Sequence, residues 1–122
     1  MRFSNLTLGR RGERLAEEHL LAQGARLLAR NFHIQYAEVD LLFEHEGELV
    51  AVEVKTRAAE DLEQPEEAIH WRQLVRLERA LAIYAQDNDL LEMPWRIDAV
   101  LIVIHLDGEV LRLDHLRSIY PG

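Results

Sequence analysis

Residues 37–56 read AEVDLLFEHEGELVAVEVKT, two apolar runs separated by a polar turn. The runs 37–43 and 49–56 have the length and the β-branched and aromatic content of strands. Between them, Glu46-Gly47 suits a two-residue turn, because glycine readily adopts the backbone conformation that tight hairpins need. The segment therefore predicts an antiparallel hairpin in which the numbers of opposed residues sum to 93.

In this register Asp40 faces Glu53 and Glu38 faces Lys55. Side chains alternate across a strand, so these four groups share one face of the hairpin. The other face is apolar throughout and comprises Val39, Leu41, Phe43, Val50, Val52 and Val54. Opposed residues have Cβ atoms ~4.5–5.5 Å apart, and two carboxylates at that separation repel unless a proton or a cation lies between them.

A divalent cation suits this arrangement, because Mg²⁺ and Mn²⁺ prefer oxygen ligands. Asp40 and Glu53 are the predicted metal ligands. Lys55 is the only lysine beside thirteen arginines, and its compact ammonium could stabilise charge on a phosphate or hold a metal-activated water. The alternative is a solvated face on which Lys55 merely offsets Glu38.

Glu13 is a further candidate, because it aligns with Ala16 and Leu20 on one stripe of a predicted helix. From there its carboxylate could reach the sheet as another ligand or as a support for the ligands. The alternative is an exposed helix acid paired with Arg10 or Arg14.

The remaining elements complete a mixed α/β domain with a central sheet and the order α-β-β-β-α-β-β. Hydrophobic periodicity, together with the positions of glycine and proline at element ends, predicts a helix over 9–23, a strand over 27–34, a helix over 65–86 that begins at Pro65, a strand within 95–106, and a strand over 109–113. Residues 57–64 are polar and predict a loop.

Composition indicates one globular domain over residues 1–122, with 48% hydrophobic and 30% charged residues. Cysteine is absent, which excludes disulfides and thiolate metal sites. No apolar run approaches ~18 residues, and the first residues lack the core of a signal peptide, so a cytoplasmic protein without membrane contact is expected. The net charge of −8 counts against nucleic-acid binding by bulk charge. The charge is uneven, however: residues 1–31 carry +3 and residues 32–54 carry −6.

Several motifs together resemble the YraN-like family of small bacterial proteins, over about Leu8 to Leu116. In chain order they are Gly12-Glu13, Ala16, Asn31, Glu38-Val39-Asp40-Leu41, Val52-Glu53-Val54-Lys55-Thr56-Arg57 and Arg96-Ile97-Asp98. Two positions depart from the pattern. Ala37 stands where the family usually has glycine, and Arg72 stands where a lysine usually opens the second helix.

That family resembles the restriction-endonuclease-like PD-(D/E)XK superfamily, including Holliday-junction resolvases. The resemblance implies a mixed four- to five-stranded sheet flanked by helices. It maps the superfamily's acids onto Glu13, Asp40 and Glu53, and its lysine onto Lys55. It further implies a nuclease that uses Mg²⁺ or Mn²⁺.

The resulting hypothesis is a metal-dependent nuclease that hydrolyses phosphodiester bonds, with DNA favoured over RNA and branched or processed DNA among the candidate substrates. Glu38 would shape the site. The candidate nucleic-acid contacts are Arg10, Arg11, Arg14, Arg57 and Arg72, although solubilising surface arginines are the alternative for the first three. A non-catalytic nucleic-acid-binding module on the same fold and a structural protein with a solvated acidic cluster remain competing hypotheses. A homodimer and a protein partner are both compatible with the sequence.

A few other residues are interpreted separately. The segment His70-Trp71-Arg72 could clamp a nucleic-acid strand by stacking, but packing of Trp71 within the helix is the favoured interpretation. Asp98, which follows Arg96 at a strand start, is interpreted as structural. The six histidines show no metal-ligand spacing.

Overall fold

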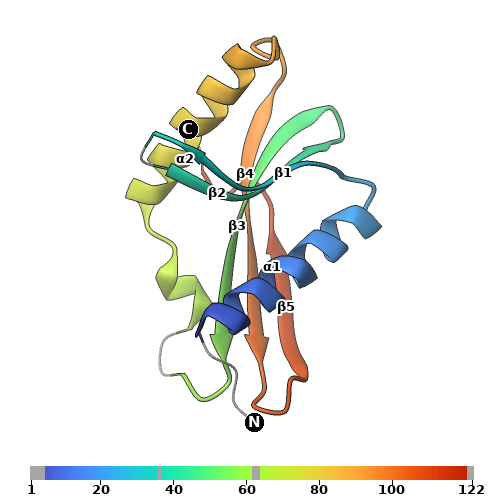
Figure 1. Cartoon of the computed structure of the whole chain (residues 1–122), viewed down its shortest axis with the longest axis vertical. Helices are drawn as coiled ribbons and strands as arrows, with labels where there is room; N and C mark the ends of the chain where they lie inside the picture. The colour runs from blue at the N-terminus through green and yellow to red at the C-terminus, as the bar shows by residue number, and fades with distance from the viewer. Residues whose placement is uncertain (1–4, 36, 62–63, 121–122) are drawn as a thin grey trace.

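A computed structural model describes residues 5–35, 37–61 and 64–120 of the chain. It contains one five-stranded mixed sheet in the order β1-β2-β3-β4-β5, flanked by two α-helices (Figure 1). The predicted order α-β-β-β-α-β-β is confirmed, and the elements are α1 (Asn5–Ala22), β1 (Arg26–Ile34), β2 (Ala37–His45), β3 (Glu48–Ala58), the short 3-10 helix η1 (Pro65–Ala68), α2 (Trp71–Asp87), β4 (Trp95–Ile104) and β5 (Val110–Leu116). Across the described ranges, no helix has both the length and the apolar character that a membrane crossing requires.

The hairpin of β2 and β3 has the predicted register. Five pairs, from Leu41–Val52 to His45–Glu48, each sum to 93. The pairing of β2 with β3 ends at Leu41–Val52. Beyond that point β2 stays paired with β1, while β3 runs parallel to β4 as far as Ala58. The two strands therefore fork, and the predicted opposition of Asp40 to Glu53 and of Glu38 to Lys55 lies inside the fork rather than in the ladder.

Each face of the sheet buries its own apolar cluster. Leu41, Phe43, Val50 and Val52 pack with Ala16 and Leu20 of α1. On the other face, a second cluster joins the strands to α2 through Leu42, Leu49, Ala51, Leu74, Leu77 and Leu81. The sheet is thus covered on both sides, as the long apolar runs of its inner strands require.

One residue of the predicted apolar face was assigned wrongly. Val39 packs in the α2 cluster, although Leu41, two residues later, packs in the α1 cluster. The same reversal occurs in β1, where Arg30 pairs with Glu17 of α1 while Phe32 contacts Tyr84 of α2 edge-to-face. In β1 the reversal coincides with Asn31, whose φ of 46° is left-handed.

The second helix begins later than predicted. Pro65 opens the four-residue η1, and α2 starts only at Trp71. Ile69 and His70 between them are extended, with ψ values of 118° and 136°. In this extended pair, Ile69 packs against the apolar cluster beneath α2. The helix is therefore interrupted between η1 and α2. The buried stripe of Leu74, Leu77 and Leu81 is as predicted.

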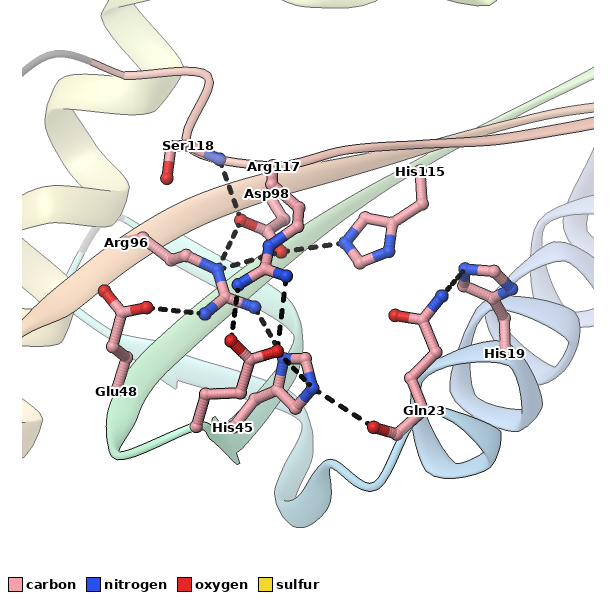
Figure 2. Close-up of polar contacts among 10 residues, drawn as sticks. His19, Gln23, His45, Glu48, Arg96, Asp98, His115, Arg117 and Ser118 are labelled. Atoms are coloured by element: carbon pink, nitrogen blue, oxygen red, sulfur yellow. Dashed lines mark hydrogen bonds and ion pairs between the residues drawn. The ribbon is translucent and has the colours of Figure 1, made fainter.

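A buried polar network locks the C-terminal segment onto the sheet (Figure 2). Asp98 is fully buried and accepts hydrogen bonds from Arg96 Nε (3.0 Å), from His115 Nε2 (2.8 Å) and from the backbone N–H of Ser118 (3.0 Å). Burial alone would raise the pKa of Asp98, but the hydrogen bonds from His115, Ser118 and Arg96 hold it below its usual value. The interpretation of Asp98 as a structural residue is therefore supported.

Arg96 connects this network to the turn between β2 and β3. Its guanidinium donates to Glu48 Oε1 at 2.8 Å and to His45 Nδ1 at 2.7 Å. Because Nδ1 of His45 accepts, the ring proton is on Nε2, which points at the carbonyl oxygen of Gln23 at 3.3 Å. These contacts fix the closed end of the β2–β3 hairpin.

Candidate active site in the fork between two strands

The fork gathers the predicted metal ligands and the single lysine. Asp40 Oδ2 accepts a hydrogen bond from the backbone N–H of Val54 at 2.8 Å, so the carboxylate takes the place of a missing ladder partner. Glu53 is only 3% exposed. Lys55 Nζ lies 3.3 Å from Glu53 Oε1, and Gln73 Nε2 of α2 donates to Glu53 Oε2 at 2.9 Å. Glu53 is therefore buried and Asp40 partly buried, which disfavours the solvated-face interpretation for this pair, although Glu38 is exposed.

The two carboxyl groups of the fork compete for one proton. Burial and the neighbouring charge of Glu53 raise the pKa of Asp40 to about 8, against the lowering effect of the Val54 N–H. Burial also raises the pKa of Glu53, although Lys55 and hydrogen bonds with Asp40 and Gln73 oppose the rise. At neutral pH the pair thus keeps a proton in a hydrogen bond between the two carboxyl groups, as repelling carboxylates do when no cation separates them.

This donor set fits a hard divalent cation. Two adjacent carboxylates that lose their shared proton offer oxygen ligands and two negative charges, and Mg²⁺ typically takes one or two carboxylates plus waters and phosphate oxygens. Within residues 5–35, 37–61 and 64–120, no three His, Cys, Asp or Glu side chains are grouped closely enough to enclose a metal ion. The fork therefore suits a site completed by water and substrate rather than a closed protein cage.

Gly12 brings α1 against β3 beside this pair. A Cβ atom built on Gly12 would lie 1.8 Å from Oγ1 of Thr56, so only glycine allows the helix backbone to come this close. The next residue, Glu13, is half-buried and lies near Asp40. Its pKa is raised first by burial and then by the charges of Asp40 and Glu38, while a hydrogen bond from Asn31 and the charge of Arg10 oppose the rise. The alternative of a simple exposed acid paired with Arg10 or Arg14 is therefore disfavoured.

A cleft of about 1040 Å³ opens at the fork, and its charged lining residues come from different elements. Glu13, Glu38 and Asp40, from α1 and β2, form the group that we call the acidic wall. Lys55, Arg57, Arg72 and Arg76, from β3 and α2, form the group that we call the basic wall. Asp61 also lines the cleft, and its Oδ2 accepts the N–H of Ala58 at 3.0 Å. A chain with a net charge of −8 thus gathers four cationic side chains in the lining of one cleft.

The predicted nucleic-acid contacts divide into two groups. Arg57 and Arg72 line the cleft. Arg10 and Arg14 are exposed on α1 but are not part of its lining. Arg11 turns away, since its Nη2 donates to the carbonyl oxygen of Gly108 in the β4–β5 hairpin at 2.7 Å.

Sequence reasoning missed two polar cleft residues of α2, namely Gln73 and Arg76. Gln73 is the more informative, because its amide holds Glu53 in place. The spacing of Arg72, Gln73 and Arg76 on one side of a helix was a usable signal. Only Arg72 was taken from it as a candidate contact.

Comparison with known proteins agrees with these motifs. Residues 12–102 match the sequence profile of the family described as "Uncharacterised protein family UPF0102". The UPF0102 protein of Syntrophomonas wolfei is 36% identical over 116 residues, which cover 95% of this chain and 99% of that relative. A UPF0102 protein of Neisseria meningitidis is 40% identical over 94 residues, covering 77% and 82% of the two chains.

The UPF0102 protein of Oleidesulfovibrio alaskensis is 39% identical over 99 residues, or 81% of this chain. That match covers 49% of the relative, so the chain spans about half of that relative's length. The profile match and the identities together show that the chain belongs to the UPF0102 family, the YraN-like family that its motifs resemble.

Proposed function

We propose that this chain is a metal-dependent nuclease of the PD-(D/E)XK type that hydrolyses phosphodiester bonds in DNA. The observation that carries the proposal is the carboxyl pair of Asp40 and Glu53, enclosed in a strand fork with Lys55 3.3 Å from Glu53. Burying two like charges costs stability unless a cation or a proton compensates them. A site that tolerates this cost beside an open, charged cleft is a candidate for catalysis.

In the proposed reaction, a water oxygen forms a bond to phosphorus, the ester P–O bond breaks, and the leaving oxygen takes up a proton. Asp40 and Glu53 would hold Mg²⁺ or Mn²⁺, which when bound polarises the phosphate and lowers the pKa of a bound water. Gln73 and Lys55 orient Glu53 from its two oxygens. The Lys55 ammonium, anchored in this way, is placed to offset charge that develops on the phosphate.

Glu13 and Glu38 have supporting roles in this proposal. Glu13 would add negative potential near Asp40 and so help to attract a divalent cation; the charge of Asp40 in turn contributes to the raised pKa of Glu13. Glu38 is exposed at the mouth of the acidic wall and would keep phosphates away from that side. A strand would then lie along the basic wall, with its scissile phosphate at the metal.

Cleavage assays with Mg²⁺ and with Mn²⁺ test the proposal on single-stranded, duplex, flap and four-way-junction DNA. We expect metal-dependent cutting by the wild type and its loss in Asp40→Ala, with the fold checked by circular dichroism. Asp87→Ala is the matched control, because Asp87 is an exposed acid at the far end of α2. Equal cutting by the wild type and Asp40→Ala would refute the assignment of the site.

A non-catalytic nucleic-acid-binding module is the second candidate, and the basic wall favours it independently of the carboxyl pair. Four cationic side chains in the lining of one cleft can bind phosphates without any chemistry. This alternative predicts binding without turnover. It also predicts that Arg72→Ala weakens binding while Asp40→Ala does not.

A further inference from the structure

Two cations of the basic wall, Arg72 and Arg76, lie on one side of α2. Residues four apart on an α-helix project from the same side, with Cβ atoms ~5–6 Å apart. Both side chains are exposed, and both line the cleft. Trp71, which the helix turns about 100° away from Arg72, does not line it. The cleft-facing side of α2 is therefore the side that carries the two arginines.

The contact between Gln73 and Glu53 fixes where these arginines stand relative to the carboxyl pair. Gln73 Nε2 of α2 donates to Glu53 Oε2 of β3 at 2.9 Å. Arg72 directly precedes Gln73, and Arg76 follows it by about one helical turn. The two guanidinium groups therefore start from backbone positions that are tied to the proposed metal site.

Neither of these guanidinium groups is engaged within the part of the chain that the structure describes. No hydrogen bond or ion pair joins Arg72 or Arg76 to another of the residues 5–35, 37–61 and 64–120. The rest of the basic wall is engaged: Lys55 Nζ lies 3.3 Å from Glu53 Oε1, and Arg57 Nη1 donates to a carbonyl oxygen of its own strand at 2.9 Å. In a chain with 22 acidic and 14 basic residues, two neighbouring cations in a cleft are thus available to an external anion.

A nucleic-acid backbone supplies anions at a spacing that suits this pair. One strand of a duplex carries a phosphate for each ~3.4 Å of helix axis. A Cβ separation of ~5–6 Å therefore spans between one and two phosphate steps. The planar guanidinium of arginine binds phosphate oxygens through two parallel N–H groups, and its long side chain can adjust to the exact separation.

The same lining offers little for the recognition of individual bases. Amide side chains are the usual partners of adenine in the major groove. Among the described lining residues only Gln73 has such a group, and its Nε2 donates to Glu53. Contacts to phosphates position a strand without carrying sequence information, so binding through the two arginines should not depend on base sequence.

We propose that Arg72 and Arg76 form a clamp for two neighbouring phosphates of one DNA strand, next to the phosphate that is cut. This inference deepens the proposed function, because it names the substrate as a polynucleotide that is held by its backbone whatever its bases. It rests on the proposed function for the cutting step alone. The clamp is a binding subsite and takes no part in bond breaking, so a small phosphodiester without neighbouring phosphates gains nothing from it.

The salt dependence of DNA binding tests the clamp separately from cutting. Fluorescence anisotropy in EDTA would use a labelled duplex and a labelled single strand, each in two unrelated sequences. Arg72→Ala and Arg76→Ala should each reduce the slope of log affinity against log salt by about 0.9 on duplex and about 0.7 on single strands, and the double variant by about twice as much, for both sequences. On duplex, the affinity deficit of each single variant should shrink about eightfold for a tenfold rise in salt, because 10 to the power 0.9 is about 8.

Control variants separate the clamp from a general effect of charge. Arg72→Lys and Arg76→Lys keep the positive charge and should keep the wild-type slope. Arg79→Ala removes an exposed arginine of the same helix that does not line the cleft. Arg26→Ala removes one that pairs with Glu44 near the closed end of the β2–β3 hairpin. Both of these alanine variants should leave the slope unchanged.

Cutting in Mn²⁺ gives a second readout. The double variant should raise KM for DNA with little change in kcat, as expected when binding is lost equally from substrate and transition state. Its hydrolysis of bis(p-nitrophenyl) phosphate, a diester without neighbouring phosphates, should equal that of the wild type. The fold is expected to persist, because Arg72 and Arg76 are exposed and alanine is the best helix former.

The clamp is refuted if the double variant has the wild-type slope, if Arg79→Ala or Arg26→Ala lowers the slope as much as Arg72→Ala, or if the wild type binds neither form of DNA. The clamp and the nuclease proposal fail separately. Binding with the expected slopes but without any metal-dependent cutting would remove only the nuclease activity. Cutting of DNA with equal KM and equal slopes for the wild type and the double variant would remove only the clamp.

Discussion

Replacing Gly12 with alanine should push α1 off the sheet and destabilise the protein. The new Cβ would lie 1.8 Å from Oγ1, 2.9 Å from Cβ and 3.0 Å from Cγ2 of Thr56, whereas ordinary contact begins at 3.4 Å. The helix must therefore retreat by about 1.6 Å (3.4 minus 1.8) at this point, unless Thr56 moves within β3. Thr56 is buried and belongs to a strand paired with β4, so the helix is the more movable partner.

Two opposing contributions set the size of the effect. Overpacking of this kind costs about 1–3 kcal/mol, and Gly12 belongs near the upper end because the side chain it meets, Thr56, is β-branched and buried in a paired strand. In the opposite direction, alanine in a helix interior is more stable than glycine by about 1 kcal/mol. We therefore expect Gly12→Ala to lower the free energy of unfolding by about 2 kcal/mol, measured by urea denaturation. The same retreat moves Glu13 away from Asp40, so cleavage should fall as well if the proposed function is correct.

Gly9 provides a matched control on the same helix. A Cβ atom built there meets no atom within 4 Å, so Gly9→Ala should stabilise the protein by about 1 kcal/mol through helix propensity alone. Thr56→Ala removes Oγ1 and Cγ2 and should restore part of the stability of Gly12→Ala. It breaks no known hydrogen bond, because Thr56 Oγ1 has no partner among the described residues. A Gly12→Ala protein as stable as Gly9→Ala would refute the close-approach argument.

Three further predictions concern the buried charges. Because the folded-state pKa of Asp40 is raised from 3.8 to about 8, its contribution to stability is complete below pH 4 and is lost as the pH rises through 8. The side chain of metal-free Asp40→Asn cannot ionise, so the variant should gain a few kcal/mol of stability relative to the wild type between pH 4 and 8. Parallel pH profiles of urea unfolding for the two proteins would contradict this. Mn²⁺ at 100 times its dissociation constant should stabilise the wild type by about 2.7 kcal/mol and leave the melting temperature of Asp40→Asn unchanged. Equal increases in the melting temperatures of both proteins, measured by calorimetry, would place the metal elsewhere. Asp98 has a lowered pKa, so its contribution to stability is present above pH 4 and is lost as the pH falls below that value. Asp98→Asn should lower the free energy of unfolding by about 3–5 kcal/mol at pH 7, because it leaves the charge of Arg96 partly uncompensated, and by less at pH 3. An equal loss of stability at both pH values would show that charge is not the cause.

The local pattern of the chain was sufficient for the order of the elements and for the hairpin. Side-chain alternation has a period of two, and the Glu46-Gly47 turn sets which residues pair, so the register between Leu41 and His45 followed from neighbouring residues alone. The buried stripe of α2 likewise follows from helical periodicity. The same reasoning identified the candidate pair of Asp40 and Glu53, because these two residues lie directly beyond the last pair of the hairpin, Leu41–Val52.

Contacts between distant segments decided the rest, because periodicity within an element carries no information about what packs against it. Val39 and Leu41 pack on opposite faces of the sheet, and α2 begins only after the extended pair Ile69-His70, of which Ile69 packs into the core. Gln73 reaches Glu53 only because α2 covers that face of the sheet. Trp71 is exposed and lies outside the cleft lining, so the favoured interpretation of packing within the helix is wrong. An amphipathic pattern shows which stripe of a helix is buried, whereas the position of the neighbouring strands decides which of the remaining side chains border the cleft and which face open solvent.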